Sequence, residues 1–237
     1  MIEVHDVCKQ FHSGKKIIHA VRNVSFHLRR GEILGIIGES GSGKSTLGRM
    51  LVRLETPTSG KIIFQGQPLH AASRDQIQMI FQDPFASLNP RMTVETILKE
   101  PSVIHKQKPR VDELLDLVGL PKNAKHRFPH EFSGGQRQRI GIARAIALNP
   151  LFIVCDEPTS ALDMSIRAQI LSLLQQLQKD FQLTYIFISH DLASVKQIAT
   201  QIAVMHEGTF VEMSETHRLF THPQHTYTQT LLDLFRN

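Results

Sequence analysis

Residues 38–46 decide the fold, and they read Gly38-Glu39-Ser40-Gly41-Ser42-Gly43-Lys44-Ser45-Thr46. This run fits the pattern G-x-x-x-x-G-K-[ST], which is expected between a strand and a helix. The apolar run Ile33–Ile37 directly before it has the composition of a strand that is buried on both faces. Glycines allow the backbone to curl so that its N–H groups point inward, and the following helix adds its positive end. These features predict a loop that binds the phosphates of a nucleotide.

Two side chains of this loop have predicted roles. Lys44 would place its ammonium on the β- and γ-phosphates, and the Ser45 hydroxyl would ligate Mg²⁺. The alternative is a glycine-rich turn with an incidental lysine. The pattern alone is compatible with a kinase, a GTPase, a motor or a transporter ATPase.

A second apolar run, Leu151–Cys155, ends in the two carboxylates Asp156 and Glu157. A parallel sheet would bring this strand end beside the phosphate loop. Asp156 would then reach Mg²⁺, directly or through water, and Glu157 would orient or deprotonate the attacking water. The alternative is a strand that leaves the core through two solvated acids.

Outside these two runs the chain divides into three zones. Residues 1–83 are rich in strand patterns, residues 84–149 have helical spacing, and residues 150–237 alternate strand and helix. In the third zone a helix expected from about Ser165 to Phe181 carries an apolar stripe, formed by Ile166, Ile170, Leu173, Leu174 and Leu177. Such alternation predicts an α/β fold with a parallel sheet flanked by helices.

A second glycine motif, Phe132-Ser133-Gly134-Gly135-Gln136, directly precedes another predicted helix. A helix N-terminus with a hydroxyl and two glycines is a second candidate anion site. One nucleotide does not need two phosphate cradles in one domain. We therefore predict a composite site, in which the second motif of one subunit covers a nucleotide held by another subunit. A flexible helix cap is the alternative.

In order and spacing, these motifs resemble those of the ATP-binding subunit of ABC transporters. The matching residues are Gly38–Thr46 (Walker A), Gln82 (Q-loop), Ser133–Gln136 (signature), Asp156-Glu157 (Walker B), Ser160–Asp163 (D-loop) and His190 (H-loop). The resemblance implies a P-loop NTPase core with a parallel sheet, an antiparallel β subdomain and a helical subdomain. It implies one ABC ATP-binding domain over residues 1–237, with the core in residues 1–83 and 150–237 and the helical part in residues 84–149. Residues 79–90 and 129–139 resemble more closely the subfamily that energises bacterial oligopeptide, dipeptide and nickel importers.

The resemblance also implies roles for individual residues. Gln82 would contribute to Mg²⁺ or water binding and sense the membrane subunits, and His190 would contact the γ-phosphate. Phe11 would stack on the adenine. ATP would lie between Gly38–Thr46 of one cassette and Ser133, Gly134, Gly135 and Gln136 of another, identical or paralogous, cassette. From the residues alone, Gln82 is a turn glutamine, His190 a structural histidine and Phe11 a core residue.

The implied cofactors are ATP and Mg²⁺, and the implied partners are a second ABC cassette, two transmembrane permease subunits and, indirectly, an extracytoplasmic substrate-binding protein. The implied location is peripheral, on the cytoplasmic face of the cell (inner) membrane. Composition agrees with a globular domain: the 237 residues are 41% apolar and 21% charged, with a formal net charge of +5. No run approaches the roughly 20 apolar residues that cross a bilayer, and we expect no signal peptide at the N-terminus.

Two other functions fit parts of the pattern. An ABC ATPase of DNA repair would need long coiled coils between residues 46 and 132, and translation factors usually carry two cassettes. We therefore expect no nucleic-acid partner. A nucleotide-gated regulatory protein would not need both Glu157 and His190. The choice between peptide and nickel as cargo stays open at this point.

Overall fold

The computed structural model describes residues 1–14 and 16–236. Its internal contacts group the chain into two compact units, each described by itself below. The first unit joins Met1–Ala72 to the chain from Thr184 onward, and the second is Ser73–Leu183. The subdomain boundaries expected near residues 83 and 150 differ from these limits and stay a prediction.

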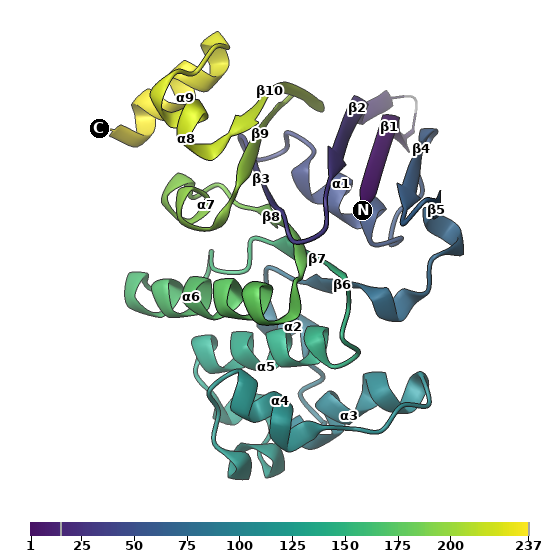
Figure 1. Ribbon diagram of the computed structural model, residues 1–237, viewed down its shortest axis with the longest axis vertical. Helices are drawn as coiled ribbons and strands as arrows, with labels where there is room; N and C mark the ends of the chain where they lie inside the picture. Colours follow the sequence, from purple (N-terminus) through teal and green to yellow (C-terminus); the bar gives the residue numbers. More distant parts are fainter. Residues whose placement is uncertain (15, 237) are drawn as a thin grey trace. The chain divides into compact units, whose positions relative to one another are not determined.

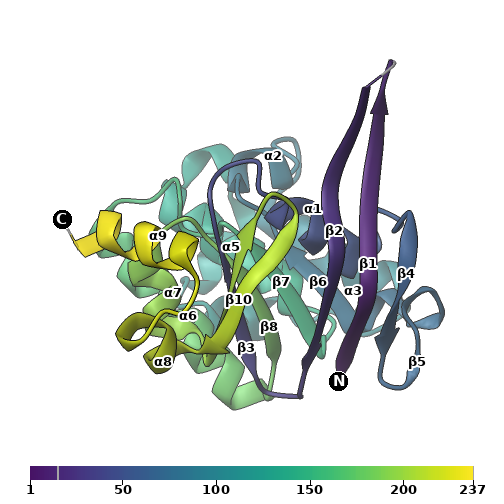
Figure 2. The same ribbon diagram turned by 90° about the horizontal axis from the view of Figure 1, so that it is seen from above.

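An antiparallel sheet forms one part of the first unit. Its strands are β1 (Ile2–Ser13), β2 (Lys16–Leu28), β4 (Ser59–Phe64) and β5 (Gln67–Pro68), in the order β2-β1-β4-β5. β1 and β2 pair along most of their length as a long hairpin (Figure 2). Val24, Phe26 and Leu28 are all buried, because alternate residues of a strand point to the same face.

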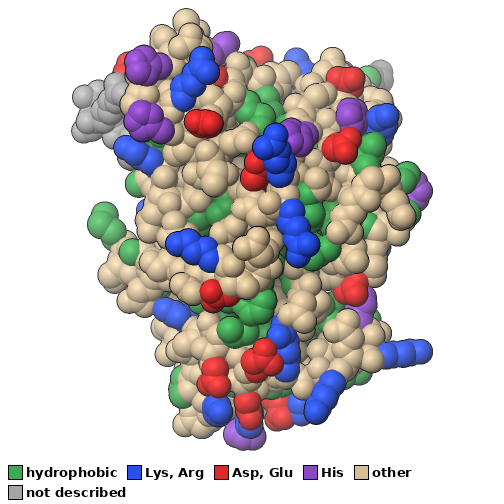
Figure 3. All heavy atoms as spheres, viewed as in Figure 1, with side chains coloured by type: hydrophobic (Ala, Val, Ile, Leu, Met, Phe, Trp, Pro, Cys, Tyr) green, Lys and Arg blue, Asp and Glu red, His purple; other side chains and the backbone are tan. Residues whose placement is uncertain are grey.

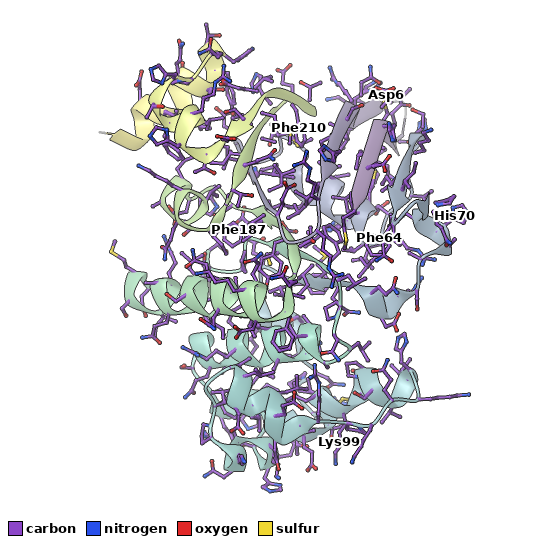
Figure 4. The ribbon with its side chains drawn as sticks, in the orientation of Figure 1. Asp6, Phe64, His70, Lys99, Phe187 and Phe210 are labelled. Atoms are coloured by element: carbon purple, nitrogen blue, oxygen red, sulfur yellow. The ribbon has the colours of Figure 1, made fainter. Side chains whose placement is uncertain are left out.

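Strands β3 (Ile33–Ile37), β8 (Thr184–Ile188), β9 (Gln201–His206) and β10 (Thr209–Glu215) form a second sheet in this unit. β3 runs parallel to both β8 and β9, and β10 pairs antiparallel with β9. Every residue of β3 and β8 is buried, as expected for central parallel strands. Phe210 of β10, labelled in Figure 4, packs against Phe26 of β2, and the two ring centroids are 5.7 Å apart.

Four helices accompany these strands: α1 (Lys44–Leu51), α7 (Leu192–Ile198), α8 (Thr216–Thr221) and α9 (Thr226–Arg236), seen in Figure 1. α7 packs closely on β3, because Gly35 has no side chain. A Cβ at position 35 would lie 2.4 Å from Cγ1 of Val195. The glycine therefore sets how near this helix can approach the strand.

The second unit contains a pair of parallel strands, β6 (Ile77–Ile80) and β7 (Phe152–Asp156). Its helices are α2 (Pro84–Ser87), α3 (Val94–Ile104), α4 (Val111–Leu117), α5 (Gly134–Ile146) and α6 (Met164–Phe181). α5 contacts the other four helices and β6, so it is the centre of the unit (Figure 1). Short 3₁₀ turns occur at Leu69–Ala71 in the first unit and at Arg74–Gln76, Lys122–His126 and Pro129–Glu131 in the second.

The apolar stripe predicted for α6 is partly wrong. Ile170, Leu174 and Leu177 are buried as expected, and Leu171 is buried with them, whereas Ile166 and Leu173 are half-buried. Leu173 lines an open surface cavity of about 610 Å³, together with residues of α4, α5 and α6. The buried face of α6 therefore includes Leu171 in place of Ile166 and Leu173.

The helical surface of the second unit carries charges of both signs. Figure 3 shows acidic and basic side chains side by side over α3 and α4. Lys125 pairs with Asp112 and Arg110 with Glu113, each at 2.8 Å. Within residues 1–14 and 16–236, no helix is both long and apolar enough to cross a bilayer.

Candidate functional site

The loop between β3 and α1 has the curled backbone that its glycines predict. Gly38, Gly41 and Gly43 all have positive φ values, of 147°, 82° and 105°. A Cβ at Gly38 would lie 2.1 Å from the Met205 carbonyl oxygen, and a Cβ at Gly43 would lie 2.1 Å from that of Ala20. Glycine is therefore required at both positions for two reasons: the positive φ, and the lack of space for a Cβ.

Lys44 opens α1 and is buried, with 5% of its surface exposed. Its ammonium donates hydrogen bonds to the carbonyl oxygens of Gly38 (2.8 Å) and Glu39 (2.7 Å). The side chain thus turns back over the loop. Ser45 and Thr46 follow in the first turn of α1 and are half-buried.

A turn between β9 and β10 braces the loop from the side, which the sequence did not indicate. The N–H of Gly208 donates to the Ser42 carbonyl (3.0 Å), and the Gly208 carbonyl accepts from the N–H of Arg22 (2.8 Å). Ser42 and Ser40 complete the loop, the first buried and the second exposed. β2, the loop and this turn form one connected hydrogen-bonded group.

His190 and Phe11 also lie in the first unit. β8 remains paired with β3 up to Ser189, whose N–H donates to the Ile36 carbonyl (3.3 Å). His190 therefore follows β8 at the sheet edge where the phosphate loop follows β3. Phe11 is 37% exposed and pairs across the hairpin with Ile18, two residues before the Ala20 that faces Gly43.

The carboxylates and Gln82 lie in the second unit. The Gln82 side-chain amide donates to Oε2 of Glu157 (3.0 Å), across 75 residues of sequence. Glu157 has a positive φ of 48°, a conformation that costs energy for a non-glycine residue and often marks functional sites. Asp156 is 6% exposed at the end of β7. Burial and, second, the charge of Asp156 raise the pKa of the Cys155 thiol, so this cysteine stays protonated.

The motif at residues 133–136 forms a reciprocal cap on α5. The Ser133 side chain accepts from the N–H of Gln136 (3.3 Å), and the Gln136 side chain accepts from the N–H of Ser133 (3.1 Å). A Cβ at Gly135 would lie 2.4 Å from Cγ2 of Ile166 on α6. Ser133, Gly134 and Gln136 are exposed, so this helix start faces outward from a closely packed base.

The comparisons with known proteins agree on one family. The family model described as ABC transporter matches residues 21–160, more than half of the chain. The chain belongs to the ABC transporter family.

Curated relatives of this ABC protein extend the match to nearly its whole length. The oligopeptide transport ATP-binding proteins AppF and OppF of Bacillus subtilis are 51% and 49% identical to it. Both alignments cover 98% of this chain, and they cover 77% and 81% of the two relatives. OppF of Streptococcus mutans is 49% identical, over 98% of this chain and 80% of that protein.

Solved structures show the same fold. The dimeric post-hydrolysis cassette MJ0796 bound to ADP and Pi superposes with a TM-score of 0.82 at 28% identity, over 91% of this chain and 99% of that one. The cbiO1 protein of Clostridium perfringens has a TM-score of 0.81 at 27% identity, over 93% and 90% of the two chains. The predicted P-loop NTPase fold is confirmed, and the chain is an ABC-type ATPase.

In this ABC ATPase the predicted site residues divide between the two units. Gly38–Thr46, Phe11 and His190 lie in the first unit, and Gln82, Asp156, Glu157 and Ser133–Gln136 lie in the second. Within the units, the structure brings Gln82 to Glu157 and places His190 at the sheet edge of the loop. The described residues contain no cluster of three or more His, Cys, Asp or Glu side chains that could hold a metal by themselves.

Proposed function

We propose that this ABC ATPase powers the import of oligopeptides across a bacterial membrane. The observation that carries the proposal is the identity of about 50% over 98% of the chain with ATP-binding proteins of oligopeptide transport. Among the cargoes left open by the sequence, these relatives favour oligopeptides over nickel. Permease subunits would form the pore, and a substrate-binding protein outside the cytoplasm would deliver the peptide. The ATPase would sit peripherally on the cytoplasmic face of the membrane.

Lys44 would place its ammonium on the β- and γ-phosphates of ATP. The positive end of α1 and the inward N–H groups of the loop would complete the phosphate site. Mg²⁺ would be held by Ser45, Asp156 and Gln82. Their donors are hydroxyl, carboxylate and amide oxygens, the hard ligands that this ion prefers. When bound, the ion neutralises charge on the transferred phosphate.

Glu157 would act as the general base that receives a proton from the attacking water. The Gln82 amide supports this role, because its hydrogen bond holds the Glu157 carboxylate in a defined orientation. His190 would contact the γ-phosphate and keep it in line. Phe11 would stack on the adenine, and the Lys9 ammonium, 4.9 Å from the centroid of the ring, lies over one of its faces.

A second cassette, a copy of this chain or a paralogue, would complete the site. Its Ser133, Gly134, Gly135 and Gln136 would cover the nucleotide held by Gly38–Thr46 of the first. Two findings support this arrangement: the start of α5 is exposed, and two solved structures of the similar cassette MJ0796 are described as dimeric. ATP would then close the pair and hydrolysis would open it, provided that the closed state binds ATP more tightly.

The segment after Gln82 would contact the permease. Phe85 is 56% exposed, and the Arg137 guanidinium lies over its ring in a cation–π contact, 3.8 Å from the ring centroid. Arg144 of α5 also donates to the Ser87 carbonyl. A displacement of this segment by the permease would therefore reach α5, which begins at the signature motif.

The test is to purify this chain with its permease subunits and binding protein in lipid vesicles. Oligopeptides should stimulate ATP hydrolysis and enter the vesicles, and Lys44→Ala should abolish both. Glu113→Gln, a surface change on α4, serves as the control. Stimulation by nickel but not by peptides would contradict the proposal, as would peptide uptake that survives Lys44→Ala.

A further inference from the structure

The start of α9 reaches the phosphate loop. The N–H of Glu39 donates a hydrogen bond to the hydroxyl of Tyr227, at 3.3 Å and across 188 residues of sequence. Both residues belong to the first unit. The stretch from His222 to Thr228 has no part in the function proposed above, so this contact requires a separate explanation.

Tyr227 and Lys44 hold the two sides of the same peptide group. The N–H of Glu39 and the carbonyl of Gly38 belong to one peptide unit, which is trans like the others described. In a trans peptide these two groups point in opposite directions. The carbonyl of Gly38 accepts from the Lys44 ammonium (2.8 Å), while the N–H of Glu39 donates to Tyr227 (3.3 Å). Hydrogen bonds on both sides of one peptide polarise each other.

Tyr227 is itself anchored to the sheet of the first unit. Its ring packs against that of His206, at the end of β9, with centroids 4.0 Å apart and planes tilted by 31°. Its N–H donates to Nδ1 of His225 (3.1 Å). The Glu212 carboxylate on β10 accepts from the N–H groups of Gln224 (3.0 Å) and His225 (2.9 Å). The hydroxyl is therefore presented to the loop from a fixed base.

We infer that Tyr227 is a positioning residue of the ATP site: it orients the Gly38–Glu39 peptide and thereby the Lys44 ammonium. The inference rests on the proposed role of Lys44 toward phosphate. Burial raises the pKa of Tyr227, although the Glu39 N–H acts in the opposite direction, so the phenol stays protonated at neutral pH. The hydroxyl then contributes a neutral acceptor without adding negative charge next to the phosphates.

The first test is Tyr227→Phe in the full chain, which removes the hydroxyl and keeps the ring against His206. Titration calorimetry with a non-hydrolysable ATP analogue should give a Kd about three- to tenfold higher, the size expected for one neutral hydrogen bond. The KM for ATP should rise similarly with little change in kcat, because Glu157 is untouched. Thr230→Ala, an exposed change on the same helix, should leave Kd and KM as in the wild type.

A second measurement separates this inference from the proposed function. Hydrogen exchange of the Glu39 amide, without nucleotide, should be about tenfold faster in Tyr227→Phe. Glu212→Ala, which loosens the base of α9, should accelerate the same amide and raise the Kd in the same direction. Unchanged Kd and unchanged Glu39 exchange in Tyr227→Phe would overturn the inference, as would an effect of Glu212→Ala alone. If the wild type itself failed to bind the analogue, the proposed function would fall and the inference with it, whereas normal binding by the wild type with an unaffected Tyr227→Phe would overturn the inference alone.

Discussion

At the scale of single residues, Gly43 carries two constraints that can be separated by substitution. Its φ of 105° disfavours any side chain, and a Cβ would meet the Ala20 carbonyl oxygen at 2.1 Å. Gly41, two residues earlier, shares only the first constraint: its φ is 82°, and a Cβ would have nothing within 4 Å. A substitution at Gly41 is therefore a matched control for the same substitution at Gly43.

We predict that Gly43→Ala lowers the free energy of unfolding more than Gly41→Ala does. The left-handed backbone costs an alanine roughly 1–2 kcal/mol at either position. At position 43 the displaced carbonyl of Ala20 adds an overpacking cost of about 1–3 kcal/mol. Urea unfolding of both variants measures the difference, and ATP affinity should fall more for Gly43→Ala. Equal losses in the two variants would show that the contact with Ala20 relaxes freely.

The paired carboxylates give a second prediction at this scale. Glu157→Gln should keep ATP binding but slow hydrolysis by roughly 100- to 10,000-fold, because a general base is lost. Gln82 can still donate to the new amide oxygen, so the local structure should persist. Phosphate release from the complex with its partners measures the rate, and Glu113→Gln controls for the loss of one negative charge. Turnover within a few-fold of the wild type would remove Glu157 from the role of base.

Residue types and spacing were sufficient to predict the curled backbone of the loop and the helix that follows it, because phosphate binding requires glycines, a lysine and a hydroxyl within nine residues. They were not sufficient for contacts made across long separations. The bond from Gln82 to Glu157 spans 75 residues and that from Glu39 to Tyr227 spans 188. No local pattern encodes such pairs, since each depends on how separate strands and helices pack.

At the scale of elements, the starts of the helices were easier to predict than their buried faces. α5 begins at Gly134, inside the motif that was expected to precede a helix, and α6 begins at Met164, one residue before the expected Ser165. In α6, however, Leu171 is buried where Leu173 was expected. Both leucines fit a helical period of 3.6 residues, and only the position of the neighbouring helices decides which one faces inward.

The docking of α9 should depend on pH through Glu212. Burial alone would raise the pKa of this carboxyl, but the N–H groups of Gln224 and His225 hold it below its ordinary value of 4.5. A lowered pKa in the folded state means that the ionised carboxylate stabilises docking above pH 4.5 and that this contribution is lost as the pH falls through the lower, folded value.

NMR titration of the Gln224 and His225 amides measures this directly. Their shifts should move together with a midpoint below 4.5, and the transition should vanish in Glu212→Gln. Tyr227 should leave Glu39 over the same pH range, which the Glu39 amide would report. A midpoint at or above the ordinary value would mean that the two N–H groups do not hold the carboxylate in solution.

At the scale of the whole molecule, the motifs proposed to bind one nucleotide are divided between the two units. The family match over residues 21–160 includes parts of both units. Lys44 caps the loop of the first unit, and Ser133 begins the exposed start of α5 in the second. If the site forms between two cassettes, defects at these two positions must complement each other in a defined way.

We predict this complementation for two copies of the chain in a Glu157→Gln background, which slows loss of the trapped nucleotide. Lys44→Ala removes the phosphate contact, and Ser133→Arg blocks the covering motif. Neither variant alone should trap ATP in a dimer, because every site has one defect. In a mixed dimer one site combines an intact Lys44 with an intact Ser133, while both defects fall in the other site. Counting trapped nucleotides in the isolated mixed dimer should therefore give one, and the unsubstituted pair should give two. Trapping by the Ser133→Arg dimer at the level of the unsubstituted pair, or no trapping in the mixture, would mean that Ser133 does not act across the interface.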